Sequence, residues 1–139
     1  EEYLKQLVAD SDLQNEIEFT GQLKKPDLFK IYNKADIYIQ ASSYEGLPHV
    51  ILEAISHNLS IISTPIGGSN EILMDGKNGW VWELKNNFIP EKNELVEIIN
   101  KISTNSKDNE NKKNNALNYL NENFDEQKNF KEYLEIIKI

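Results

Sequence analysis

The chain has 139 residues, no cysteine and no arginine, and its 15 lysines against 23 acidic residues give a net charge of −8. The lack of cysteine excludes a disulfide scaffold, a thiolate metal site and a cysteine nucleophile, and the acidity argues against nucleic acid as a partner, because such binding needs basic patches. No apolar run approaches the ~20 residues of a membrane helix and no basic-plus-apolar leader opens the sequence, so we expect a cytoplasmic protein.

The first half of the sequence predicts short strands that alternate with helices. Residues 1–10 read as the end of an amphipathic helix, with Leu4 and Leu7 on its apolar stripe. Asn58 stands where a left-handed residue would end a helix. The expected strands and helices are, in chain order, strand 17–20, helix 26–32, strand 36–40, helix 48–57, strand 60–64, helix 71–74 and strand 80–83.

The character of the sequence changes from Glu91 onward. Apolar residues at helical spacing predict three helices, centred on residues 95–102, 116–120 and 130–137, with a polar break over 103–111. We interpret residues 1–103 as part of a Rossmann-like domain and residues 104–139 as helices that pack on the same domain.

Strands that alternate with helices at short intervals predict an α/β fold with a mainly parallel sheet, here of about four strands. In such sheets, ligands bind beyond the carboxyl ends of the strands. Two segments fall there, Ala41–Pro48 and Thr64–Glu71.

The segment that begins at Glu45 carries the strongest chemical signal. Gly46 lets the backbone come close to a bound group, and the helix that starts near Pro48 points free amides at the same space, which favours a phosphate. Glu53 lies about a turn and a half into that helix, where a carboxylate can accept hydrogen bonds from paired hydroxyls. The glycine turn at Gly67 would add further amides.

The run from Ala41 to Ala54, ASSYEGLPHVILEA, resembles the donor-site signature of family 4 retaining glycosyltransferases. These enzymes have the GT-B fold, two Rossmann-like domains with the active site between them, and their mark is two glutamates separated by seven residues. Segments 61–71 and 76–81 match the family pattern in order and spacing, and the resemblance runs from about Ile17 to Val81.

The resemblance implies a role for each matching residue. Glu45 would be the catalytic residue beside the transferred sugar, and Glu53 would bind the ribose of the nucleotide. The residues expected to bind the donor sugar and diphosphate are Ser42, Gly46, Leu47, Pro48, Gly67 and Gly68. It implies no metal and no cofactor, with a nucleoside-diphosphate sugar as co-substrate.

The resemblance also implies what this chain lacks. Family members carry an upstream Arg/Lys pair that contacts the diphosphate and a separate N-terminal domain that binds a glycan or lipid-linked acceptor. We therefore expect this chain to be the donor-binding half of a longer enzyme of polysaccharide or glycoconjugate synthesis, inactive alone. Lipid-linked acceptors would bring the full enzyme to the inner face of a membrane.

Plainer interpretations stand beside these. The two glutamates could be solvated carboxylates near a helix end, the glycine pair could serve only a turn, and Trp80 and Trp82 are expected to pack. The paired lysines, Lys24–Lys25 and Lys112–Lys113, could touch an anionic membrane but suit a solvated face better. For the whole chain, the alternatives are a non-catalytic nucleotide-sugar-binding or regulatory module and another GT-B enzyme, such as a nucleotide-sugar epimerase.

Overall fold

The structure is a computed structural model that describes residues 1–44, 46–85 and 89–124, with the backbone alone at 89–90. The chain divides into two compact units, Glu1–Lys30 and Ile31–Ile139. The division into domains that we expect at residue 103 stays a prediction.

The first unit contains helix α1, Glu2–Asp10, and the beginning of helix α2, Lys25–Tyr32. Lys5 pairs with Glu1 at 2.6 Å, and its ammonium lies 5.8 Å from the centre of the Phe19 ring. The strand expected over residues 17–20 is not formed. Its alternating pattern is typical of a strand, but a strand needs a hydrogen-bonded neighbour, and residues 1–30 contain no assigned strand.

The second unit is built on a parallel sheet in the order β1-β2-β3. Its strands are β1 (Ile37–Gln40), β2 (Ser60–Ser63) and β3 (Trp80–Val81). Helices α3 (His49–Ser56) and α4 (Ser69–Ile72) connect them, and a small antiparallel pair, β4 (Leu84–Lys85) with β5 (Ile89–Pro90), follows. The last described elements are helices α5 (Lys92–Thr104) and α6 (Ser106–Asn123). The predicted α/β class with a parallel sheet is confirmed, although three of the four expected strands form.

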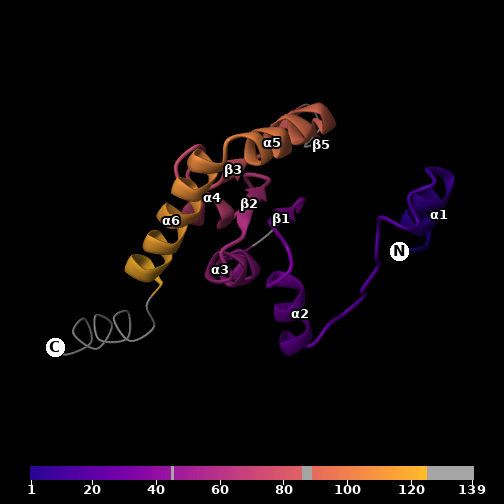
Figure 1. Cartoon of the computed structure of the whole chain (residues 1–139), viewed down its shortest axis with the longest axis horizontal. Helices are drawn as coiled ribbons and strands as arrows, with labels where there is room; N and C mark the ends of the chain where they lie inside the picture. The colour runs from indigo at the N-terminus through magenta and orange to yellow at the C-terminus, as the bar shows by residue number, and fades with distance from the viewer. Residues whose placement is uncertain (45, 86–88, 125–139) are drawn as a thin grey trace. The chain divides into compact units, whose positions relative to one another are not determined.

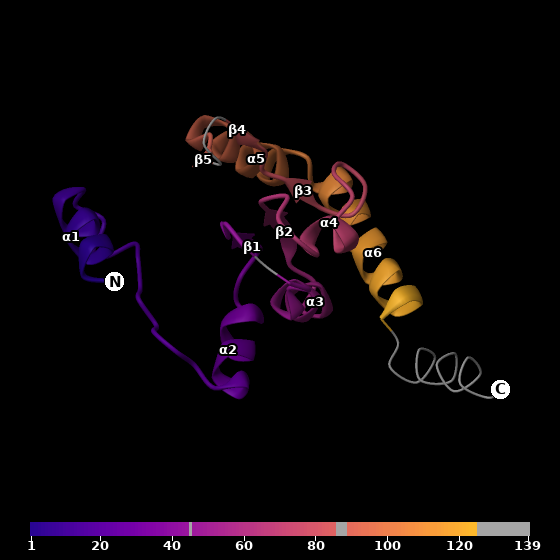
Figure 2. The same ribbon diagram turned by 180° about the vertical axis from the view of Figure 1, so that it is seen from behind.

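Both faces of the sheet are covered by helices. Successive residues of a strand point to opposite faces, yet Ile61 and Ile62 of β2 are both at most 1 % exposed. Ile62 packs in one cluster with Trp82 and with Ile98 and Ile102 of α5. Figures 1 and 2 show α5 on one side of the sheet and α3 on the other. Such two-sided burial is typical of parallel sheets.

Three polar side chains of helix α6 bond to other elements of the unit. Asn109 accepts a hydrogen bond from the Ser60 hydroxyl (2.7 Å), Asn115 donates to the carbonyl of Lys77 (2.9 Å), and Tyr119 donates to the carbonyl of Glu71 (2.7 Å). Asn115 and Tyr119 are four residues apart and share a helix face, whereas Asn109, six residues before Asn115, lies on another part of the helix surface. Figure 1 shows α6 beside α4.

The polar break expected over residues 103–111 is therefore wrong from Ser106 onward, where α6 begins. The Asn105 side chain accepts a hydrogen bond from the amide of Asp108 at 3.2 Å and caps the helix. The apolar residues of α6 lie in its second half, around residues 116–120, so its polar first half carries no apolar periodicity. The third helix expected in this region, around residues 130–137, lies outside the described residues.

Candidate functional site

Two loops meet at the carboxyl edge of the sheet. The register of the parallel pair aligns Gln40 with Ser63, so the segments that follow β1 and β2 leave the sheet side by side. Thr64, the first residue after β2, is 2 % exposed, and its hydroxyl donates to the carbonyl of Ser42 at 2.7 Å. The first loop is thereby fastened to the end of the neighbouring strand.

A backbone hydrogen bond joins the two loops farther along. The amide of Gly68 donates to the carbonyl of Gly46 at 2.8 Å. A side chain at position 68 would not fit, because a Cβ atom there would lie 2.6 Å from the Gly46 oxygen and 2.9 Å from the Cα of Leu47. The structure thus brings Gly68 against Gly46 and Leu47, with Ser42 bonded to Thr64 nearby, and their role as donor-binding residues stays a prediction.

The preceding residue, Gly67, requires glycine for a different reason. Its φ of +53° lies in the left-handed region, which a Cβ disfavours. The plainer interpretation, a turn that needs a positive φ, is therefore correct at Gly67 but not at Gly68, whose φ is −67°. Both glycines thus have a structural reason, and the amide of Gly68 is already bonded within the protein.

Ser69 organises this turn, a role that sequence reasoning did not assign. The side chain is 2 % exposed. Its hydroxyl lies 2.6 Å from the carbonyl of Ile66 and 2.9 Å from that of Thr64, and it accepts from the Ile66 amide at 3.0 Å. A serine directly after a glycine pair was the available signal, since serine hydroxyls commonly bond to nearby backbone groups.

Helix α3 begins at the same edge. Pro48 is buried and stands just before the first helical residue, His49, which is exposed. The first turn of α3 contains no acidic residue, and no side chain caps it. The partial positive charge of this helix start is therefore not offset locally, which suits an anionic group beside Gly46 and Leu47.

The structure describes only one of the two glutamates of the predicted site. Glu45 lies outside the described residues. Glu53 is half-buried in the middle of α3, one turn after His49 and so on the same helix face. Burial, and secondly the charge of Glu53, raise the pKa of Tyr32 above its usual value, so the carboxylate lies toward the end of α2.

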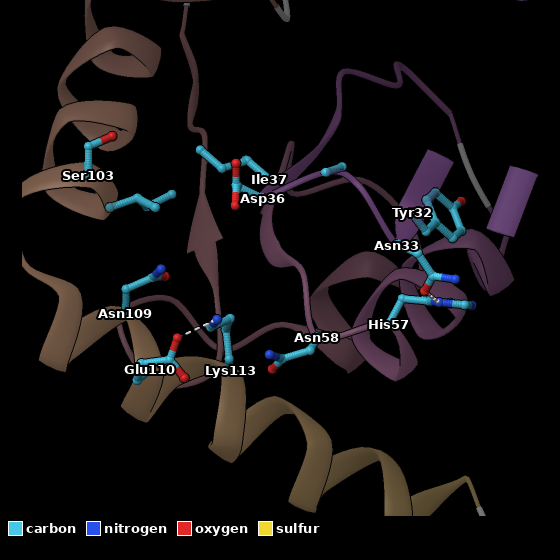
Figure 3. A pocket seen from close by; sticks show the side chains of 12 residues that line it. Tyr32, Asn33, Asp36, Ile37, His57, Asn58, Ser103, Asn109, Glu110 and Lys113 are labelled. Atoms are coloured by element: carbon cyan, nitrogen blue, oxygen red, sulfur yellow. Dashed lines mark hydrogen bonds and ion pairs between the residues drawn. The ribbon is translucent and has the colours of Figure 1, made fainter. Parts of the chain in front are cut away.

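A pocket of about 570 Å³ lies at the opposite, amino edge of the sheet. Its walls include Asp36, directly before β1, and Asn58, two residues before β2 (Figure 3). Much of its polar lining is paired within the protein: Asn33 with His57 at 2.8 Å, and Glu110 with Lys113 at 2.5 Å. Side chains satisfied in this way have little left to offer a ligand, so this pocket is not our candidate site.

The chain was compared with known families and structures. The sequence profile of the family described as Glycosyl transferases group 1 matches residues 1–119. The chain belongs to this family.

Individual relatives of this group 1 domain agree with the assignment. It is 37 % identical over 139 residues to the uncharacterized glycosyltransferase MJ1069 of Methanocaldococcus jannaschii, a match that covers 99 % of this chain and 34 % of the relative. The chain thus spans about a third of the length of that protein. The C-terminal domain of LpcC, a group 1 family protein from Francisella tularensis, superimposes with a TM-score of 0.74 at 23 % identity, over 91 % of this chain and 63 % of that domain.

A further crystal structure, of Anabaena HepE in complex with UDP and glucose, superimposes with a TM-score of 0.84 at 23 % identity. The match covers 98 % of this chain and 35 % of HepE. At this level of identity the likeness shows the fold. The expected half of a GT-B fold is therefore confirmed.

Several alternatives considered for single residues of the glycosyltransferase domain are now decided. Trp82 is 8 % exposed and Trp80 packs against the same cluster, so both tryptophans pack, as predicted. The side chains of Lys112 and Lys113 are 9 % and 14 % exposed and pair with Asp108 and Glu110. A solvated or membrane-facing role for this lysine pair is wrong, because both side chains are largely buried against the rest of the domain.

Two further kinds of feature, a metal site and a membrane-spanning helix, are not found among the described residues. Within residues 1–44, 46–85 and 89–124, no group of His, Asp and Glu side chains is arranged to hold a metal ion. None of the helices in these ranges is both long and apolar enough to cross a bilayer.

Proposed function

We propose that this domain is the nucleotide-sugar-binding half of a retaining glycosyltransferase. The full enzyme would transfer a sugar, of hexose type, from a nucleoside diphosphate to an acceptor hydroxyl and keep the anomeric configuration. The observation that carries the proposal is the hydrogen bond from Gly68 to Gly46, which locks two glycine turns together beside the start of α3. This edge follows the strands at the place where α/β sheets bind ligands.

The backbone at this edge would hold part of the charge of a diphosphate without a side-chain cation. The amides near Gly46 and Leu47 and the start of α3 would face the phosphates, while Gly67 and Gly68 would form the floor of the donor pocket. Pro48 would fix the helix start, and Ser42, held through its carbonyl by Thr64, would line the sugar side. The UDP and glucose in the HepE complex support a donor of this class, because that protein shares the fold.

The two glutamates would contact different parts of the donor. Glu53 would accept hydrogen bonds from the ribose hydroxyls, and Glu45 would lie beside the anomeric carbon. Catalysis would rest on electrostatic stabilisation of the departing diphosphate and of a cation-like sugar. We propose that this needs no metal or other cofactor.

The acceptor and part of the diphosphate site would lie outside this chain. A net charge of −8 without arginine leaves the domain short of cations for a diphosphate, so we propose that it is inactive by itself. In the full protein, an N-terminal domain would bind a glycan or lipid-linked acceptor of polysaccharide synthesis, in the cytoplasm and at the inner face of the membrane.

The test uses the full-length protein and a labelled nucleoside-diphosphate sugar. Glu45→Ala should lower kcat by at least about 100-fold, as the loss of transition-state stabilisation does elsewhere. Glu53→Ala should raise the donor KM by roughly tenfold, because it removes a charge-assisted hydrogen bond to bound donor. Asp36→Asn is the matched control, since this carboxylate lies at the amino edge and should leave both constants unchanged.

Unchanged turnover in both glutamate variants would overturn the catalytic assignment. Donor binding without any transfer by the unaltered protein would instead favour a non-catalytic or regulatory module. Release of an epimerised sugar from the nucleotide would favour an epimerase.

A further inference from the structure

Helix α4 connects the glycine turn to the rest of the domain, and its carbonyl groups are held by side chains from elsewhere. The carbonyl of Glu71 accepts a hydrogen bond from the Tyr119 hydroxyl at 2.7 Å. The carbonyl of the next residue, Ile72, accepts a hydrogen bond from the side-chain amide of Asn78 at 2.9 Å. Asn78 is 2 % exposed and belongs to the turn that leads into β3.

The turn that carries Asn78 is itself tied to α6. Asn115 donates to the carbonyl of Lys77 at 2.9 Å, one helical turn before Tyr119 on the same face. Two side chains of α6 therefore hold the segment that follows the glycine pair, one directly at α4 and one through the neighbouring turn.

Helix α4 cannot hold its own position. It has four residues, Ser69–Ile72, and a helix of this length has no independent stability in water. It begins directly after Gly68, whose amide is bonded to Gly46 and whose α-carbon has no room for a methyl group. A small displacement of α4 would therefore change the contact between the two glycine loops.

We propose that Tyr119 is a positioning residue for donor binding. By fixing the carbonyl of Glu71 it holds α4 in place, and α4 in turn holds Gly67 and Gly68 against the loop at Gly46. The hydrogen bond of Tyr119 goes to Glu71, which is not a residue of the proposed donor site. This inference rests on the proposed function, since the loop that it positions is the proposed floor of the donor pocket.

The same helix supplies a matched control. Asn109, in the first half of α6, accepts a hydrogen bond of the same length from the Ser60 hydroxyl, at the amino edge of the sheet. Loss of either bond would loosen α6, but only the bond of Tyr119 leads to α4. A purely structural role of α6 would make the two variants behave alike.

The experiment compares Tyr119→Phe with Asn109→Ala in the full-length protein, with UDP-glucose as donor. Tyr119→Phe should raise the donor KM about three- to tenfold, the effect of one hydrogen bond, and leave kcat within about twofold. Asn109→Ala should leave both constants unchanged. Hydrogen exchange measured by mass spectrometry should become faster over residues 66–73 in Tyr119→Phe and stay unchanged there in Asn109→Ala.

Equal KM values and equal exchange over residues 66–73 in Tyr119→Phe and the unaltered protein would overturn the inference. Equal changes in both variants would overturn it too, because they would indicate general loosening of α6. If the unaltered protein shows no affinity for any nucleotide sugar, the proposed function fails and the donor role of Tyr119 fails with it, whereas the exchange data still show whether Tyr119 fixes α4.

Discussion

The two edges of the parallel sheet differ in how their polar groups are used. At the amino edge, a pocket of about 570 Å³ is lined by side chains that bind one another, such as Asn33 with His57. At the carboxyl edge, two loops are joined through their backbones, from Gly68 to Gly46, beside a helix start whose charge no acidic residue of its first turn offsets.

This difference shows that the volume of a cavity is a weak guide to function. The amino edge has room, but much of its hydrogen-bonding capacity is already satisfied. The carboxyl edge includes backbone amides and a helix start whose partial positive charge no acidic residue of its first turn offsets. Binding of an anion there would be favourable. The predictions below test whether changes at one edge leave the other unaffected.

The largest effect is expected from Gly68→Ala, at the carboxyl edge. The added methyl group would meet the Gly46 oxygen at 2.6 Å and the Cα of Leu47 at 2.9 Å. Because both are backbone atoms, the loops must move apart. We expect the free energy of unfolding to fall by about 1–3 kcal/mol and the affinity for UDP to fall at least tenfold, measured by urea unfolding and calorimetric titration.

Gly46→Ala is the control for packing at this edge. A Cβ atom at Gly46 would have no neighbour within 4 Å, so the free energy of unfolding should change by less than about 0.5 kcal/mol. Unaltered UDP affinity in Gly68→Ala would show that the contact between the loops is irrelevant to binding and would remove the contrast between the edges.

A smaller effect is expected from Lys112→Ala, on the side of the amino edge. The Lys112 ammonium lies 4.5 Å from the centre of the Trp80 ring and 2.6 Å from a carboxylate oxygen of Asp108. Loss of the cation–π contact and of the buried stem should lower the free energy of unfolding by about 1–2 kcal/mol. The affinity for UDP should not change.

Lys112→Arg keeps the charge and should recover part of this loss in the same unfolding experiment, followed by tryptophan fluorescence. A fall in UDP affinity in Lys112→Ala as large as that in Gly68→Ala would contradict the independence of the two edges.

The smallest effect concerns Tyr32, which lines the amino-edge pocket and is also influenced by Glu53. Its pKa is raised in the folded protein, first by burial and then by the charge of Glu53. Above the ordinary tyrosine pKa of about 10, the unfolded chain loses this proton first, so the contribution of Tyr32 to stability falls as the pH rises through its folded pKa.

Position 32 of Tyr32→Phe has no proton to lose, so the stability of this variant should decline less steeply above about pH 10, measured by urea unfolding at each pH. Parallel curves for the variant and the unaltered protein would show that the pKa of Tyr32 is the same in the folded and the unfolded protein. The evidence that Glu53 lies near Tyr32 would then be lost.

Much of the second unit could be predicted from its sequence. Apolar runs bounded by turn residues predict β1 and β2, and Asn58 takes the expected left-handed conformation with a φ of +61°. The loops at the carboxyl edge could be predicted because glycines are needed there for reasons of backbone space and conformation.

The remaining features leave weaker signals. Helix α6 docks through Asn109, Asn115 and Tyr119, which no hydrophobic pattern reveals. Strands β4 and β5 have two residues each, too few for any period. The role of Ser69 could not be predicted, since its buried contacts depend on how the glycine turn folds.

The polar docking of α6 has a calorimetric consequence. Exposure of apolar surface raises the heat capacity of a protein, whereas exposure of polar surface lowers it. Detachment of α6 would expose amide and hydroxyl groups together with Ala116 and the half-buried Leu120, so its heat-capacity change should be smaller, for the same area, than that of the isoleucine core. The attachment of α6 would then vary less with temperature than the core around Ile62, which weakens on cooling. The helix that steadies α4 would therefore lose less of its hold in a cold cell than the core does.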